Sequence, residues 1–554
     1  MFRQYTSKLS PSDKVCQDNV ASWQPVLEKW EDVMQWAAGE GPSKHVERHH
    51  ERGMLSARDR MALILDPESP FLELMPTAGY GIKHSSPNAS VLCGIGLVHG
   101  RLVMIAGNIP TLDSGASNEI SVKKSKRASN IALENGLPMI YINQSAGANL
   151  PQQFRVFHDG GVGFKDITLR SAAGSPTCTI VFGSSTAGGA YQPGMSSYSI
   201  FVKEQAQVFL GGPPLVYMAT GEVTTAEELG GAEMHTSISG VGDAFAVDEF
   251  EACQLARNWV LSLPESNMST AEQPPVTPPR YDPQDILQVV PVNIRQPMDM
   301  REVIARIVDD SRFEIFKGTF GQGMLCGWAR IHGHLVGIIG NQSPVIMIPE
   351  AQKATHFIRL NNENSTPIVF LHNVTGFMVG KKSEQNGIIR AGSTFIDAVS
   401  RSTVPHISIL CGASYGAGNY AMCGRAYAPR FLFSWPNSKC SVMGPEQLAG
   451  VMEMIAREAA TKAGGEVDEA KISARTNGLK NQVEKESDAY STSAWVLDDG
   501  VIDPRDTRDV LAEQQLIRDE QYKIALLLGI LMRNQGFTLP RPRSSYRYVT
   551  TPGF

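Results

Sequence analysis

The chain has 554 residues, of which 42% are hydrophobic and 19% charged, and its formal net charge at pH 7 is −6. This length exceeds what one hydrophobic core supports, so we expect at least two domains of a folded globular protein. The acidic balance argues against a nucleic-acid-binding protein. A membrane-spanning helix is not expected, because no apolar run reaches the required length of about 18 residues.

The N-terminal segment MFRQYTSKLSPSDKVCQDN has no apolar signal core and contains Asp13 and Asp18, which argues against an import sequence. The eight cysteines are scattered along the chain without a C-x-x-C pair. This spacing favours buried thiols in a reducing compartment over disulfides or a zinc site, and we expect no bound metal.

Similarity within the chain predicts a duplicated domain. CGIGLVHGRLVMIAGN (93–108) matches CGWARIHGHLVGIIGN (326–341), so that Cys93 is aligned with Cys326. ENGLPMIYINQSAG (134–147) matches ENSTPIVFLHNVTG (363–376), and TIVFGSSTAGGAY (179–191) matches SILCGASYGAGNY (408–420), with the same spacing between the two copies in both cases. Three further matches keep the same order, and an ordered set of this kind is not expected by chance.

Each copy alternates β-rich runs such as PMIYIN, CTIVFG, PIVFLH and ISILCG with helix-patterned stretches, which predicts an α/β fold with a largely parallel sheet. Eight prolines fall between Pro264 and Pro297, so we expect a linker over residues 266–297. The predicted domains are therefore residues 23–265 and 298–540. Residues 508–536 have a helical pattern suited to burial against the body or a neighbouring subunit.

The segment Gly412-Ala413-Ser414-Tyr415-Gly416 fits the G-x-S-x-G pattern of a serine nucleophile. In the α/β-hydrolase order a histidine follows the serine, but every histidine of this chain lies at or before His406. Another fold could supply a base from upstream. The twin segment GSSTAG lacks the closing glycine, so the two copies share small residues rather than a nucleophile motif, and we expect Ser414 not to be a nucleophile.

The twins share a strand that runs into small residues: Ala187-Gly188-Gly189 in one copy and Ala417-Gly418 in the other. Small residues let a ligand approach the backbone, and N–H groups at the start of a helix lack intrahelical acceptors. Such groups can stabilise an oxyanion, although glycines can also serve only a tight turn. Two matched segments favour two oxyanion holes. GFMVGKKS has three residues between its glycines instead of the four of a P-loop, so we do not expect nucleotide binding there.

The motifs TGFMVG, SYGAGNYAMCGRAYAPRF, TAGGAY, GGPPLV with ATGE, and DDGVIDPRDTR resemble the carboxyltransferase (β) subunit of biotin-dependent acyl-CoA carboxylases. The second half of the chain is especially similar to the methylcrotonyl-CoA and geranyl-CoA carboxylase type. The resemblance implies two tandem crotonase-like (ββα superhelix) domains. It also implies an active site between the first domain of one subunit and the second domain of its neighbour, in a β hexamer that binds six biotin-carrying α subunits (α6β6).

By this resemblance, the N–H groups of Gly188 and Gly189 would bind the acyl-CoA thioester carbonyl, and those of Ala417 and Gly418 the ureido carbonyl of biotin. The acyl-CoA-binding stretch would correspond to residues 334–363. Further binding positions implied are Ala146, Gly147, Ala187, Gly376, Phe377 and Gly416, with Lys124 and Lys353 either contacting CoA phosphates or lying on ordinary helix surface.

The first half departs from the family at Gln144-Ser145-Ala146-Gly147, at YQPGMSSYS (191–199) and at Tyr217-Met218. These departures fall where the acyl group should bind, so 3-methylcrotonyl-CoA is the expected substrate and geranyl-CoA or another acyl-CoA is the alternative. A biotin-dependent acyl-CoA decarboxylase subunit, an inert assembly subunit and a hydrolase are the remaining alternatives. No biotinylation or ATP-binding motif occurs, so we expect biotin to be carried by the partner, in the cytoplasm of a bacterium or the mitochondrial matrix of a eukaryote.

Overall fold

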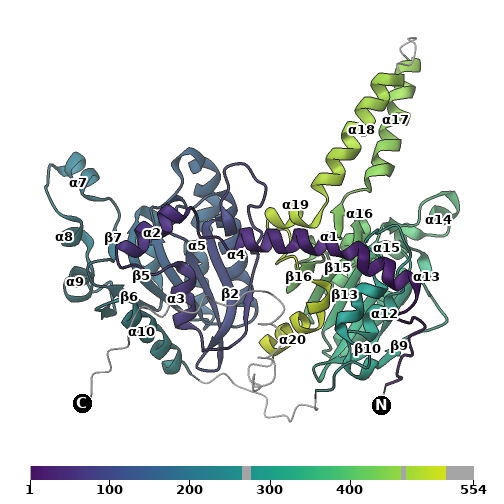
Figure 1. Ribbon diagram of the computed structural model, residues 1–554, viewed down its shortest axis with the longest axis horizontal. Coiled ribbons are helices and arrows are strands. Elements are labelled where there is room, and N and C mark those ends of the chain that lie inside the picture. Colours follow the sequence, from purple (N-terminus) through teal and green to yellow (C-terminus); the bar gives the residue numbers. More distant parts are fainter. Residues whose placement is uncertain (1, 265–275, 463–468, 519–554) are drawn as a thin grey trace. The chain divides into compact units, whose positions relative to one another are not determined.

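The computed structural model describes residues 2–264, 276–462 and 469–518 and divides the chain into two compact units. The N-terminal unit is Trp36–Ser269. The C-terminal unit combines Thr270–Gln515 with Met1–Gln35. Figure 1 labels the elements of both units.

The N-terminal unit is an eight-stranded sheet with its helices. Its strands are β1 (Phe71–Glu73), β2 (Val91–Val98), β3 (Arg101–Asn108), β4 (Met139–Ser145), β5 (Thr177–Thr186), β6 (Tyr198–Val202), β7 (Gln207–Phe209) and β8 (Ala244–Ala246). Its helices are α2 (Ser43–Glu51), α3 (Ala57–Ile64), α4 (Glu119–Glu134), α5 (Gln153–Ala172), α6 (Tyr191–Met195), α7 (Pro213–Thr220), α8 (Ala226–Gly230), α9 (Ala232–Met234) and α10 (Glu249–Ser262).

The C-terminal unit contains a seven-stranded sheet and a small two-stranded one. Its strands are β9 (Phe313–Ile315), β10 (Met324–Ile331), β11 (His334–Asn341), β12 (Val345–Ile346), β13 (Ile368–Val374), β14 (Gly376–Phe377), β15 (His406–Tyr415), β16 (Phe431–Ser434) and β17 (Lys439–Ser441). Its helices are α11 (Ile286–Val289), α12 (Met300–Ala305), α13 (Ile348–Glu363), α14 (Lys381–Gln385), α15 (Ile388–Arg401), α16 (Gly416–Ala421), α17 (Pro445–Lys462), α18 (Glu469–Glu486), α19 (Ala489–Ala494) and α20 (Thr507–Arg518), with α1 (Lys14–Ala37) at its N-terminal side. Helices α17 and α18 lie side by side and extend away from the rest of this unit (Figure 1).

The two sheets have the same strand plan. The first begins with the antiparallel strands β1-β2-β3 and continues with the parallel strands β3-β4-β5-β6. The second begins with the antiparallel strands β9-β10-β11 and continues with the parallel strands β11-β13-β15-β16. Short strands β7 and β17 pair with the ends of β5 and β15. The predicted α/β class with a largely parallel sheet is confirmed.

The central strands are apolar because both of their faces are covered. All ten residues of β15 are buried, as are all seven of β13. In the N-terminal unit, Ile140, Ile180 and Phe182 pack with residues of α3 and α10, such as Met61 and Ala256. In the C-terminal unit, Phe370 of the sheet packs with Phe357 of α13 and Phe395 of α15. Helices α4 and α13 directly precede the strands formed by the runs PMIYIN and PIVFLH, in line with the predicted alternation of helices and strands.

The first 35 residues pack with the second half of the chain, so the units divide at Trp36 rather than at residue 23. Trp23 is fully buried and its indole donates a hydrogen bond to the Val290 carbonyl, while Trp30 donates to the carbonyl of Val501. Within the predicted linker, Ile286 and Val289 are buried in the C-terminal unit, so its described part belongs to that unit. The predicted helix over residues 508–536 is described only as far as the end of α20; the remainder lies outside the described residues.

Among the helices of the described ranges, none is both long enough and apolar enough to cross a membrane.

Candidate active site

The sheets share an irregularity where their central strands end. In the N-terminal unit the pairing of β4 with β5 shifts register between Asn143 and Ser145. In the C-terminal unit the pairing of β13 with β15 shifts between His372 and Val374, which are the matched positions of the second copy. Bulges of this kind are frequent next to active sites, because they redirect the side chains around them. The strand ends of both units therefore have the same backbone plan.

Each bulged residue packs over a glycine of the neighbouring strand. A Cβ built on Gly183 of β5 would lie 2.6 Å from Gln144 Cδ, and one on Gly412 of β15 would lie 2.6 Å from Asn373 Oδ1. A larger residue at either glycine would have to displace the side chain of Gln144 or Asn373. This close approach explains why the twin segments keep a glycine at this position.

The residue after each strand adopts the same unusual backbone conformation. Ala187 follows β5 with φ of 53°, and Gly416 follows β15 with φ of 55°. A left-handed conformation at the non-glycine Ala187 is strained, and such strain clusters at functional sites. A helical turn then begins in both units: a 3₁₀ turn over Ala187–Ala190 and helix α16.

These turns carry four of the residues predicted from the sequence, two in each unit. Gly188 and Ala417 are exposed, Gly189 is partly exposed and Gly418 is buried. The first N–H groups of a helical turn have no acceptor within that turn. Each turn therefore offers backbone donors next to an exposed small residue, which is the arrangement that an oxyanion hole requires.

Little room remains for a side chain on the turns. A Cβ on Gly418 would lie 2.7 Å from Val374 Cγ2 and 3.2 Å from Gly376 Cα. A Cβ on Gly189 would lie 2.9 Å from Ser185 Oγ, and one on Gly188 would lie 3.3 Å from the ring of Phe164. The glycines thus serve close backbone approach as well as the turn itself.

The structure also places the predicted binding residues that follow β4 and β13. Gly376 (φ 141°) lies against Gly418, and its neighbour Phe377 contacts the position of Gly392 in α15. In the N-terminal unit Gly147 (φ 90°) lies next to Thr186, the residue that precedes Ala187. Ala146 is exposed, and its N–H donates a hydrogen bond to the carbonyl of Ser114. In each unit the segment after the bulge thus lies beside the helical turn.

The prediction for Lys124 and Lys353 is wrong. Both were expected on a helix surface or against CoA phosphates, but both are buried, with side chains about 0% and 1% exposed. Lys124 Nζ donates to Asn88 Oδ1 at 2.5 Å, and Lys353 Nζ donates to the Gly321 carbonyl at 3.4 Å. Burial lowers the pKa of both amines. The helical pattern did not reveal this, because it does not say that another segment covers this side of α4 and α13.

Ser414 has a histidine beside it, which the sequence analysis missed. His372 of β13 places Nδ1 2.9 Å from Ser414 Oγ, and Asn419 of α16 donates to the same oxygen at 2.8 Å. Ser414 and His372 are both 0% exposed. Burial lowers the pKa of His372 to about 3. A substrate has no access to this serine, so the pair is not a hydrolase dyad.

The N-terminal unit has the matching arrangement. Asn143 Nδ2 donates to Ser185 Oγ at 2.9 Å, and Ser185 Oγ donates to the carbonyl of Gly189 at 2.9 Å. Asn143 and Ser185 are as buried as their counterparts His372 and Ser414. The spacing between the two copies, applied to the serine and to the preceding strand, identifies both pairs and is the signal that sequence reasoning had available.

Gln144, one of the departures from the family pattern, is held in place by a hydrogen bond from Arg60. Arg60 Nη1 donates to Gln144 Oε1 at 2.8 Å, and the same guanidinium makes a two-pronged ion pair with Glu249 at 2.8 and 2.7 Å. Arg60 also lies over the ring of Phe182. Gln144 is therefore a fixed part of the bulge.

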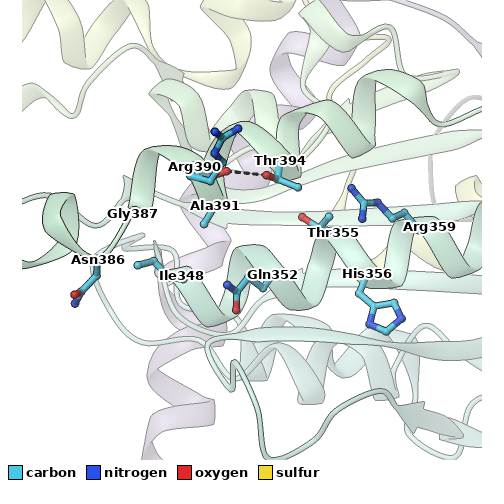
Figure 2. Close-up of a pocket in the computed structure, with 10 residues that line it drawn as sticks. All are labelled: Ile348, Gln352, Thr355, His356, Arg359, Asn386, Gly387, Arg390, Ala391 and Thr394. Carbon is cyan, nitrogen blue, oxygen red and sulfur yellow. Dashed lines mark hydrogen bonds between the residues drawn. The ribbon is translucent and has the colours of Figure 1, made fainter.

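The C-terminal unit has a pocket of about 580 Å³ between helices α13 and α15 (Figure 2). It is lined by Ile348, Gln352, Thr355, His356, Arg359, Asn386, Gly387, Arg390, Ala391 and Thr394. Arg359 and Arg390 are exposed, and His356 Nδ1 lies 3.0 Å from Lys317 Nζ. Of the groups at this pocket, His356 and Arg359 belong to the stretch 334–363 that the resemblance assigns to acyl-CoA, and Arg390 comes from α15.

The carboxyl transferase domain model matches residues 48–524, which is most of the chain. The chain belongs to the carboxyl transferase family. It is 50% identical, over 91% of its length and 95% of the relative's, to the probable biotin-dependent acyl-coenzyme A carboxylase beta2 subunit of Mycobacterium tuberculosis. It is 44% identical, over 85% of each chain, to the probable mitochondrial methylcrotonoyl-CoA carboxylase beta chain of Drosophila melanogaster.

A solved structure supports this family membership. The beta subunit of geranyl-CoA carboxylase from P. aeruginosa is 36% identical to this chain and has a TM-score of 0.87, with 94% of this chain and 98% of that one covered. The resemblance in the sequence analysis is thereby confirmed: the chain is a carboxyltransferase component of the biotin-dependent acyl-CoA carboxylase type.

Proposed function

We propose that this carboxyltransferase moves CO2 from carboxybiotin, carried by a partner subunit, to 3-methylcrotonyl-CoA or a longer 3-methyl-2-enoyl-CoA. The observation that carries the proposal is the matched pair of turns, with Ala187 and Gly416 in the same left-handed conformation after β5 and β15. A reaction in which two carbonyl oxygens gain negative charge in turn needs two such sites.

The N-terminal turn is the proposed site of the thioester. The N–H groups of Gly188 and Gly189 bind its carbonyl oxygen, which becomes negative when the substrate loses a proton. Phe164 packs against Gly188, and Tyr191 meets the Phe164 ring edge-on at a centroid distance of 5.8 Å. Aromatic groups beside this turn suit an apolar acyl chain better than an acetyl or propionyl group.

The C-terminal turn is the proposed site of the biotin ureido group. At Gly418 there is no space for a side chain, since a Cβ would meet Val374. Ala417 is exposed, so this turn presents only backbone and one methyl group to the ligand. Carboxybiotin supplies the CO2 and then the base for the substrate proton. The N–H groups of Ala417 and Gly418 hold the ureido oxygen and stabilise its negative charge. We further propose that the pocket between α13 and α15 takes the phosphates of CoA, because Arg359 and Arg390 suit anionic groups.

The assembly is proposed from the same family. Tandem crotonase-like domains arising by duplication are supported by the matched strand order and the matched bulges. A β hexamer with biotin-carrying α subunits in an α6β6 complex is the assembly that the family resemblance implies, and Leu150, Phe154 and Phe157, each more than 70% exposed, suit an apolar interface with another chain. The proposed location is the cytoplasm of a bacterium or, as the Drosophila relative is named, a mitochondrion.

The test is a panel of acyl-CoAs, assayed with the chain, its biotin-carrying partner, ATP and labelled bicarbonate. We expect the highest kcat/KM on 3-methylcrotonyl-CoA or a longer 3-methyl-2-enoyl-CoA, with acetyl- and propionyl-CoA poorer. The isolated chain should carry no biotin and should show no ATPase activity. A higher kcat/KM on propionyl-CoA than on every 3-methyl-2-enoyl-CoA would overturn the substrate assignment. Activity on no acyl-CoA would overturn the proposed function.

A further inference from the structure

Two buried pairs of polar side chains connect the central strands to the turns of the candidate site. We infer that Asn143 with Ser185, and His372 with Ser414, are positioning pairs that fix the orientation of the two turns, so that their removal lowers kcat rather than substrate affinity. This inference rests on the proposed function, since the turns are its two sites of charge stabilisation.

The N-terminal pair reaches its turn through a backbone carbonyl. Ser185 Oγ donates to Gly189 O at 2.9 Å and accepts from Asn143 Nδ2 at 2.9 Å. Asn143 Nδ2 also lies 3.5 Å from Gly189 O. The peptide that follows Gly189 is therefore held from the sheet by both members of the pair. Its orientation determines where the neighbouring N–H groups point.

The C-terminal pair contacts α16 through a side chain of that helix. Ser414 lies two residues before α16, and its Oγ accepts a hydrogen bond from Asn419 within that helix. His372 Nδ1 lies 2.9 Å from the same oxygen. The pair thus connects β13 to the helix that carries Ala417 and Gly418.

Stability of the fold alone does not account for these side chains. The neighbouring positions of β4 and β13 are filled by Ile142 and Leu371, which are apolar and buried. His372 is kept neutral, since burial lowers its pKa to about 3. Replacing a buried polar pair by apolar groups of similar shape is often close to neutral for stability. Two unrelated residue types, asparagine and histidine, contact the serine through a nitrogen atom at 2.9 Å at matched positions, which indicates that this contact is what the site uses.

The twin units supply the conservative replacement. His372→Asn installs the residue found at the matched position of the N-terminal unit, and its amide group, which both donates and accepts, can hydrogen-bond to Ser414. We expect His372→Val to lower kcat about tenfold, the effect of one lost hydrogen bond with a partner left unsatisfied. His372→Asn should retain most of the kcat that His372→Val loses. Ser185→Ala should by itself lower kcat several-fold, with the C-terminal unit unchanged.

The control is His406→Asn. His406 is also buried and lies on β15, but at the opposite end from the turn, where it contacts Ser402 and Cys423. This variant should keep the wild-type kcat. If His372→Val does not fold, then Ser185→Ala and His372→Asn still give the answer, because each leaves the sheet packing nearly unchanged.

The assay is carboxylation by the holoenzyme of the acyl-CoA that gives the highest kcat/KM in the panel, with KM for that acyl-CoA and the melting temperature measured for each variant. We expect kcat to fall while KM stays within about twofold of wild type. The inference is overturned if Ser185→Ala keeps the wild-type kcat, or if His372→Val and His372→Asn are equally impaired. An inactive wild-type holoenzyme would instead overturn the proposed function, so the two failures are distinguishable.

Discussion

Gly418→Ala is the most direct test of the C-terminal turn. A Cβ at this position would lie 2.7 Å from Val374 Cγ2 and 3.2 Å from the Cα of Gly376. Carbon atoms pack favourably at about 3.5–4.0 Å, so the new methyl group must move by about 1 Å. Val374 is a fully buried part of β13, and Gly376 contributes backbone, so the element that moves is the start of α16.

The displacement has two separate effects. Overpacking of this kind costs about 1–3 kcal/mol of unfolding free energy. Misplacing catalytic groups by about 1 Å can lower the rate by about 10²-fold. We therefore expect kcat of the holoenzyme to fall about 10²-fold, while KM for the acyl-CoA, which the proposed function binds at the other turn, changes little.

The matched control is Gly478→Ala in α18. No heavy atom lies within 4 Å of a Cβ built there, and its φ is not positive. Alanine in a helix interior is more stable than glycine by about 1 kcal/mol, so this variant should be slightly stabilised and fully active. Both variants are assayed by labelled bicarbonate incorporation and by thermal unfolding. If Gly418→Ala loses stability but retains the wild-type kcat, the turn is not part of the active site.

Three further outcomes are expected. Fluorophosphonate probes should not label the wild-type protein, because Ser414 is fully buried and hydrogen-bonded; labelling at Ser414 would contradict this. Arg359→Ala combined with Arg390→Ala should raise KM for acyl-CoA about 10²-fold or more with kcat nearly unchanged, since each charge-assisted hydrogen bond contributes about 1.5–3 kcal/mol; an unchanged KM would exclude the pocket as the CoA phosphate site. Burial lowers the pKa of His372 to about 3 and of His406 to about 4, so only the unfolded chain gains these protons as the pH falls from about 6.5 to 4, and the unfolding free energy decreases over that range. Denaturant titrations at pH 5 and 7 measure how steeply the unfolding free energy changes with pH. His406→Asn should make this slope shallower by up to about 1.4 kcal/mol per pH unit, and an unchanged slope would refute the lowered pKa of His406.

The amino-acid sequence was sufficient for features that are local or repeated. The apolar runs that became β4, β5, β13 and β15 are continuous in the chain, so their strand character follows from burial on both faces. The glycines at 188, 189 and 418 follow those strands directly, so they could be named as turn residues before their contacts were known. The constant spacing between the two copies also paired the two turns correctly, because a duplicated domain conserves the spacing between its strands.

Only the tertiary structure decided what surrounds those positions. His372 and Ser414 are 42 residues apart, and their contact depends on a bulge in the pairing of β13 with β15 that no periodicity reveals. Arg60 reaches Gln144 across 84 residues. The buried state of Lys124 likewise depends on Asn88, a residue of a distant segment. A helical pattern fixes the spacing of side chains along a helix, but which of them are covered is determined by the other segments that fold against it.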